Sequence, residues 1–113
     1  MKKFLVLFFA PAEEREKMQT ATPEQMQAGM KPWLDWFSKV GDAVVDKGSP
    51  VTRTMSLTKS GTQPGDASLV AYEVVQAEDI DKALALMQDN PHLERMGTEI
   101  QVHEMWDMNG MIK

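Results

Sequence analysis

The segment KKFLVLFF, residues 2–9, decides the fold of this chain because it has two incompatible interpretations. Two lysines, a short apolar run and Ala10-Pro11-Ala12 are typical of a secretory signal with its cleavage site. The same run also fits a β-strand that is apolar on both alternating faces, with Phe4, Val6 and Phe8 on one and Leu5, Leu7 and Phe9 on the other. The run is at the short limit for a signal, so we interpret it as a strand that is covered on both sides.

The size and composition predict one soluble domain that spans residues 1–113. No apolar run approaches the roughly 18 residues that a membrane-spanning helix needs. The net charge is −5 and the basic residues are scattered, so neither nucleic acid nor a membrane is an expected partner. The chain has no cysteine, which excludes disulfides, thiol catalysis and Cys-ligated metals and is compatible with the cytoplasm, the expected location.

The sequence after the first strand predicts a loop and then a long helix. The charged residues 13–17 are expected to form a solvated loop. Thr22-Pro23-Glu24-Gln25 predicts a helix start in which Thr22 and Gln25 form a capping box, and the helix is expected to extend to Asp46. Pro32 predicts a kink near Gly29 or two abutting segments. Apolar residues at three- and four-residue steps predict one core-facing side, made of Met26, Met30, Trp33, Leu34, Phe37, Val40 and Val44.

The second half of the chain predicts a hairpin, a helix and a last strand. Residues 51–58 (VTRTMSLT) alternate like a strand, and the turn-rich residues 59–66 connect them to a third strand at 69–77. Asp79 is expected to cap a second helix whose Ile80, Ala83, Leu84 and Met87 share one face, and Pro91 follows its end. A fourth strand is expected at 99–107. No secondary structure is assigned to the tail that follows, Met108 to Lys113, and its residues 109–113 are not placed in the fold.

The element order β-α-β-β-α-β predicts an α+β, ferredoxin-like fold with an antiparallel four-stranded sheet. Both helices of such a unit cover the same face of the sheet, yet the first strand is apolar on its other face too. We therefore expect a second copy to cover that face, in a homodimer with a two-fold axis. The ten methionines are interpreted as core fillers, with Met26, Met30 and Met87 facing the core.

Several segments resemble the YCII-related family of small bacterial proteins: KKFLVLFFAPA, WLDWFSKVGDAVVDKGSPV, YEVVQAEDIDKALALMQDNPHL and IQVHEM. The resemblance extends from about Lys2 to Met108 and implies a ferredoxin-like fold in a dimeric α/β-barrel assembly. A His-Asp catalytic pair has been proposed for some members, with the histidine on the first helix. The expected first helix here, residues 22–46, contains no histidine, so that pair does not transfer. Asn90-Pro91-His92-Leu93 matches a subgroup of the family.

The two histidines are the candidates for proton transfer, because only histidine has an unperturbed pKa near neutral pH. We expect His92 to lie in a loop at the mouth of a pocket between sheet and helices, as a general acid or base or as a hydrogen-bond donor to a ligand. The alternative for His92 is a loop-fixing or surface role. His103 alternates with Glu104 in the last strand, so it is expected at an interface or on the surface.

Three further residues are candidates for substrate binding: Arg53, Tyr72 and Trp36. Arg53 either pairs with Glu73 across the expected hairpin, which we favour, or holds an anionic substrate. Tyr72 either offers its hydroxyl to the same cavity or packs in the core. Trp33 and Phe37 are expected to share the core face, and Trp36 to border a pocket or the dimer interface.

Metals and cofactors are not expected. A site built from His92, His103 and Glu73 or Asp89 lacks any ligand spacing that supports it, and nucleotide-binding motifs are absent. Two functions remain open. The first, which we favour, is a cofactor-free enzyme on a small organic acid or lactone with His92 as the general acid or base, by fold-level analogy. The alternative is a non-enzymatic homodimer that senses a small ligand or binds another protein.

Overall fold

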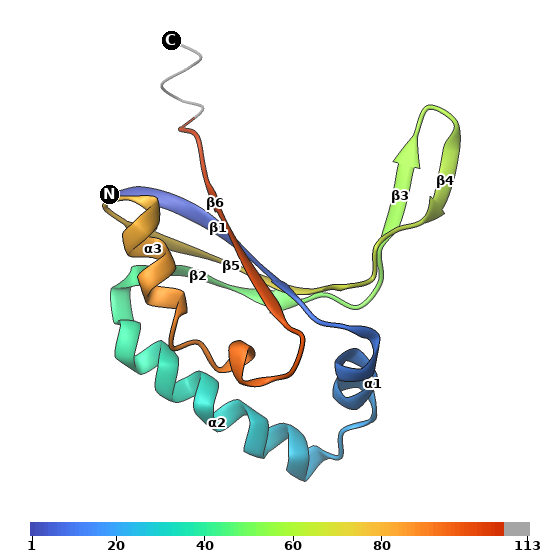
Figure 1. The fold of residues 1–113 in the computed structure, drawn as a ribbon, viewed down its shortest axis with the longest axis horizontal. Coiled ribbons are helices and arrows are strands. Elements are labelled where there is room, and N and C mark those ends of the chain that lie inside the picture. The colour runs from blue at the N-terminus through green and yellow to red at the C-terminus, as the bar shows by residue number, and fades with distance from the viewer. Residues whose placement is uncertain (108–113) are drawn as a thin grey trace.

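The computed structural model describes residues 1–107 and has an α+β architecture. One four-stranded antiparallel sheet is built from β1 (Lys2–Phe9), β2 (Val44–Pro50), β5 (Leu69–Ala77) and β6 (Glu99–Glu104). Three helices, α1 (Ala12–Thr20), α2 (Pro23–Val40) and α3 (Ile80–Met87), lie on one side of this sheet (Figure 1). The other side of the sheet is bare within the described chain.

The strand order in the sheet is β2-β5-β1-β6, so β1 is an inner strand that pairs with β5 and β6. The predicted first and third strands are confirmed with the same bounds, and residues 2–9 are a structural strand. All pairings are antiparallel, and this order is compatible with a ferredoxin-like arrangement.

The core lies between the sheet and the helices. Phe4, Val6 and Phe8 of β1 are almost fully buried on the helix-covered face, whereas Leu5, Leu7 and Phe9 are only half-buried on the open face. This alternation is the one expected from the strand period of two. The rest of the buried apolar cluster is Trp36, Val75, Ala77, Ala83 and Met87.

Helix α2 begins as predicted and ends earlier. Thr22 Oγ1 accepts a hydrogen bond from the Gln25 backbone N–H at 3.1 Å, and Gln25 Oε1 accepts one from the Thr22 N–H at 2.9 Å, which confirms the capping box. The helix continues through Pro32 and ends at Val40, not at Asp46. Gly41 follows with a positive φ of 54°, a conformation that favours glycine. The predicted core position of Met87 is confirmed, whereas Met26 and Met30 are exposed.

Residues 13–17 are not a loop, because they lie within helix α1. The segment AEEREKMQT is rich in good helix formers and has no apolar stripe, so its hydrophobic pattern carried no helix signal. Two polar contacts hold it instead. Arg15 donates a hydrogen bond to the Ala10 carbonyl at 3.0 Å, and Arg95 pairs with Glu14 at 3.2 Å.

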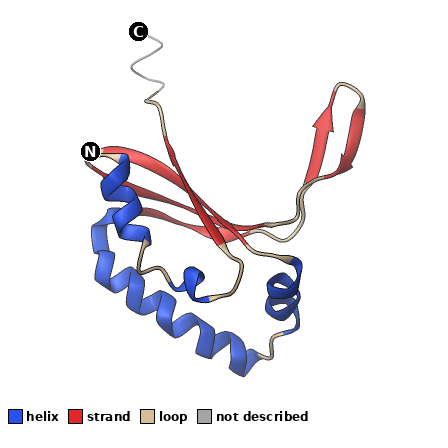
Figure 2. Cartoon of the chain, viewed as in Figure 1, coloured by secondary structure: helices blue, strands red, loops and turns tan. Residues whose placement is uncertain are grey.

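The prediction of the second sheet strand at 51–58 was wrong. The sheet strand is β2, and residues 55–58 form β3 (Met55–Thr58), which pairs with β4 (Gly61–Pro64) in a separate two-stranded hairpin. Figures 1 and 2 show this hairpin projecting beyond the sheet. The expected pairing of 51–58 with β5 is reduced to one backbone hydrogen bond, from the Val51 N–H to the Val70 carbonyl oxygen at 2.9 Å, since β2 occupies that edge.

The last third of the chain follows the prediction more closely. Asp79 Oδ1 accepts from the Lys82 N–H at 2.8 Å and caps α3 as expected. A 3₁₀ turn, η2 (Pro91–Glu94), then leads to β6, which ends at Glu104 and not at Asp107. The predicted tail at 108–113 lies outside the described residues. No helix within residues 1–107 is long and apolar enough to cross a membrane.

Candidate functional site

Three of the four buried polar side chains within residues 1–107 lie close to the sheet on the side that the helices cover, and the fourth is Glu14 of α1. Glu73 is on β5, Asn90 precedes η2 and His92 lies within η2, and their exposed fractions are 1%, 1% and 4%. Buried polar groups cost free energy unless they are hydrogen-bonded, so each of these side chains needs a physical account.

Glu73 lies in an apolar surrounding with an unpaired carboxyl oxygen. Its Cα is opposite Val6 of β1, and Ala71 and Val75 flank it on the same face of β5. Oε1 has no hydrogen-bond partner among residues 1–107. Desolvation by burial raises the pKa of Glu73 to about 8. The carboxyl is therefore largely neutral at pH 7 and can act as a proton donor.

The predicted Arg53–Glu73 ion pair is absent from the described chain. Arg53 is exposed in the segment between β2 and β3, and Glu73 is buried under the helices. The pairing was wrong because Arg53 lies beyond the end of β2 and is not paired with β5, although the Val51 N–H still donates to the Val70 carbonyl oxygen at 2.9 Å.

A bulge in β2 brings Gly48 close to Glu73. The β2–β5 register shifts between Asp46 and Ser49, and Gly48 has φ +66° at that irregularity. A Cβ at Gly48 would lie 1.8 Å from the Tyr72 carbonyl oxygen and 3.1 Å from the Glu73 Cα. Both the backbone angle and this close approach require glycine, so Gly48 supports the backbone that positions Glu73.

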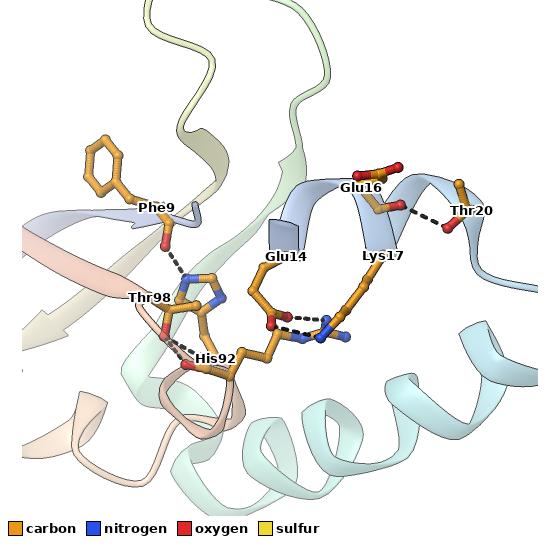
Figure 3. A network of polar contacts seen from close by, with 8 residues as sticks. Phe9, Glu14, Glu16, Lys17, Thr20, His92 and Thr98 are labelled. Atoms are coloured by element: carbon orange, nitrogen blue, oxygen red, sulfur yellow. Dashed lines mark hydrogen bonds and ion pairs between the residues drawn. The ribbon is translucent and has the colours of Figure 1, made fainter. Parts of the chain in front are cut away.

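His92 is fixed to the end of the first strand. Its Nε2 lies 2.8 Å from the Phe9 carbonyl oxygen (Figure 3), and its ring meets the Phe8 ring edge-on at 5.3 Å between centroids. Since a carbonyl only accepts, Nε2 carries the proton in this contact. Burial lowers the pKa of His92, although the bond to Phe9 opposes that effect, so the neutral imidazole is favoured. The only nitrogen left for proton exchange is Nδ1.

Asn90 links the buried end of α3 to η2. Its Oδ1 accepts a hydrogen bond from the His92 backbone N–H at 2.9 Å, which fixes the orientation of the amide. The Nδ2 group has no partner among residues 1–107. The helix-covered side therefore holds one unpaired donor on Asn90 and one unpaired oxygen on Glu73.

An ionic cluster beside this region ties α1 to the segment after η2 (Figure 3). Glu14 pairs with Lys17 at 3.4 Å and with Arg95 at 3.2 Å. Desolvation raises the pKa of Glu14, but the two cations outweigh it and the net effect is a lowered pKa. Thr98 Oγ1 lies 2.8 Å from both the His92 and the Arg95 carbonyl oxygens and donates to this turn. Together these contacts hold the loop that carries His92.

Aromatic rings from α2 cover the helix side of the sheet. Trp33 meets Phe8 edge-on at 5.5 Å, and Trp33, Trp36 and Phe37 contact one another at 5.4 to 6.2 Å between centroids. Trp33 and Phe37 pack against the core as predicted, but they are only partly buried. Trp36 is the most buried of the three, at 4% exposed, and it also borders a pocket as expected.

The structure does not bring the predicted site residues together. His92 and Trp36 lie on the helix-covered side, whereas Tyr72 is opposite Leu7 on the open face, away from the face that carries Glu73. His103 is exposed on that open face, opposite Leu5, and contacts Gln101 at 3.0 Å. His92 lies inside the fold and not at a pocket mouth.

The sequence did not lead us to predict that Glu73 and Asn90 are buried with an unpaired polar atom. For Glu73 the signal was present, because strand alternation places it on the same face as Val75 and Ala77. For Asn90 no signal was available, since an asparagine before proline is typical of any helix end.

Two pockets border α2. One, of about 310 Å³, lies between α2 and α3, and the other, of about 320 Å³, lies between α2 and the start of β2, where Lys47 Nζ sits 5.2 Å from the centre of the Phe37 ring. Neither is lined by Glu73 or His92. Within residues 1–107, no group of three or more acidic or histidine side chains is arranged to hold a metal ion.

No family model matches this chain, and no curated protein matches its sequence.

Proposed function

We propose that this protein is a cofactor-free enzyme that performs general acid–base chemistry on a small organic acid or lactone. The observation that carries the proposal is Glu73, a carboxyl buried in an apolar environment with an unpaired oxygen. A catalytic acid or base works best when its pKa lies near the working pH, and burial raises the pKa of Glu73 to about 8.

Glu73 takes the leading role that the sequence suggested for His92. A neutral carboxylic acid in a dry environment donates a proton or a strong hydrogen bond to a substrate carbonyl. The unpaired Nδ2 of Asn90 offers a second donor on the same side of the sheet. His92 remains in the proposal as the group that holds η2 in place and as a second proton carrier through Nδ1.

The proposed enzyme is a ferredoxin-like homodimer related to the YCII family, in the dimeric α/β-barrel arrangement, and works in the cytoplasm. The sheet order supports the fold, and half-buried apolar side chains on the open face support the dimer. They are Leu5, Leu7, Phe9, Tyr72 and Val74. A second sheet packed on these residues would remove them from water and close the barrel.

A ligand screen followed by a rate measurement tests the proposed reaction. Small carboxylates, phenols and lactones are screened by thermal shift against wild type, Glu73→Gln and the control Glu99→Gln, an exposed carboxyl on β6. A ligand at one hundred times its Kd stabilises by about 2.7 kcal/mol, a shift of several degrees for a domain of this size.

We expect the compound that stabilises wild type to be converted, with a pH–rate profile that breaks near pH 8. Glu73→Gln is expected to lose at least a hundredfold in kcat, which is the usual contribution of a general acid, and Glu99→Gln to keep full activity. Unchanged turnover in Glu73→Gln would refute the assignment of the acid. Failure of every compound to shift or react would refute the enzyme.

A further inference from the structure

The pocket between α2 and α3 combines an apolar floor with a cationic rim. It has a volume of about 310 Å³ and is lined by two helix stripes, with Trp36, Lys39 and Val40 from α2 and Lys82, Ala85, Leu86 and Asp89 from α3 and the residues after it. The spacings of three and four residues bring each set to one side of its helix, so the two stripes face each other. The pocket is of a size that suits a small molecule.

The floor is preorganised by Trp36. The indole Nε1–H donates a hydrogen bond to the Leu86 carbonyl oxygen at 3.3 Å, one of the carbonyls that the last turn of α3 leaves unpaired. This bond fixes the ring and satisfies its only donor, so the small part of Trp36 that reaches the pocket, from a residue 4% exposed, is apolar. Val40, Ala85 and Leu86 extend this apolar surface.

The rim carries more positive than negative charge. Lys39 and Asp89 form an ion pair of 2.7 Å across the two helices, and both side chains are largely exposed. Lys82 has only a loose ion pair with Glu78, at 3.8 Å, so its ammonium is available to another anion. Two lysines and one aspartate line a pocket on a chain whose net charge is −5. Charge complementarity therefore favours an anion at this place.

We propose that this pocket binds a small aromatic carboxylate, with its ring on Val40, Ala85 and Leu86 next to the buried Trp36 and its carboxylate between Lys82 and Lys39. The apolar side chains of the lining favour a hydrophobic ring, and the two lysines favour a negatively charged group on that ring. This site is independent of the proposed acid–base function, because neither Glu73 nor His92 lines the pocket.

The test follows the indole N–H of Trp36 by nuclear magnetic resonance during a titration with phenylacetate. The chain has three tryptophans, and the Trp36 signal is assigned from single tryptophan-to-phenylalanine variants. Lys82→Met removes the charge and keeps the length of the side chain. Lys59→Met makes the same change on the turn between β3 and β4, away from the pocket. Phenylacetamide has the same ring without the charge.

We expect a saturable shift of the Trp36 signal with phenylacetate. Loss of one surface charge contact corresponds to a Kd about fivefold higher, which is the expected effect of Lys82→Met and of phenylacetamide. Lys59→Met and Glu73→Gln are expected to bind as wild type does, so this proposal and the proposed enzyme fail separately. The proposal is overturned if the Trp36 signal does not saturate, if the amide binds as well as the acid, or if Lys82→Met and Lys59→Met behave alike.

Discussion

At the scale of single residues, His92, Asn90 and Glu73 reduce the free-energy cost of burying a polar group in different ways. His92 is buried as a neutral ring with a carbonyl partner, and Asn90 satisfies its oxygen but not its Nδ2. Glu73 avoids the cost of an unpaired buried charge by keeping its proton. Neutrality by protonation depends on pH, so Glu73 and His92 have testable consequences for stability.

Glu73 is expected to make the protein less stable as the pH rises. Its pKa is about 8 in the folded chain against an ordinary value of 4.5, so the folded state binds more protons between these values. The stabilisation is complete below pH 4.5 and is lost as the pH rises through 8, with a slope of up to about 1.4 kcal/mol per pH unit. Glu73→Gln has no such group, and urea unfolding from pH 5 to 9 should show its slope reduced relative to wild type. Equal slopes in both proteins would exclude the raised pKa.

His92 is expected to make the folded protein less stable at acidic pH. Its pKa is lowered in the folded chain, so the unfolded state binds the extra proton and stability is lost as the pH falls below the ordinary value of 6.5. His92→Phe should remove this loss, and at pH 7.5 it should cost about 1–3 kcal/mol because the Phe9 carbonyl loses its partner. The control His103→Phe changes an exposed ring and leaves the bond between His92 and the Phe9 carbonyl in place, so it should not show that cost. Identical urea midpoints for the two variants would contradict the structural role of His92.

At the scale of elements, the sequence predicted strands with clean alternation and helices with clear caps. Residues 2–9 and 69–77 form strands with the predicted bounds, and Thr22 and Asp79 cap helices as expected. The strand β2 was missed because its segment VVDKGSP carries turn-forming residues and two register irregularities. Residues 55–58 do form a strand, but alternation does not specify a partner, and it pairs with β4. Because residues 51–58 were expected to be the strand next to β5, Arg53 was predicted to face Glu73. The absence of an ionic partner for Glu73 was therefore not predicted.

The bulge in β2 predicts a position-specific effect of glycine substitution. Gly48→Ala is expected to destabilise the protein by more than about 1 kcal/mol, because it combines a left-handed backbone with a clash against the Tyr72 carbonyl. Gly41→Ala is the matched control, since Gly41 also has a positive φ of 54° but an added Cβ meets nothing within 4 Å. Thermal unfolding of both variants separates the two costs. A Gly48→Ala midpoint at or above that of Gly41→Ala would rule out the close approach.

At the scale of the whole molecule, the single chain is a flat plate. Its radius of gyration is 15.9 Å and its extents are 49 × 45 × 21 Å, whereas a compact domain of this length has a radius of about 13 Å. The molecule is thin because helices cover only one face of the sheet. The β3–β4 hairpin projects beyond the sheet, and its Met55 and Leu57 are exposed. Trp106 is 75% exposed just after β6. Such a surface is unusual for a monomer and is typical of a chain that pairs.

The proposed homodimer predicts that a charge on the open face separates the subunits. Leu7 lies on the central strand, half-buried and opposite Tyr72, so Leu7→Glu would place a carboxylate in the apolar centre of the interface. Light scattering after gel filtration should give twice 12.7 kDa for wild type and 12.7 kDa for this variant. Ile80→Glu, a similar change on the exposed side of α3, should remain dimeric.

Circular dichroism of the Leu7→Glu protein decides between dissociation and unfolding. A folded monomer supports the interface, and if the variant does not fold, Val74→Glu on the neighbouring strand repeats the test on the same face. Wild type that remains at 12.7 kDa at all accessible concentrations would exclude the dimer. The acid–base proposal would survive that result, because Glu73, Asn90 and His92 all lie on the opposite side of the sheet.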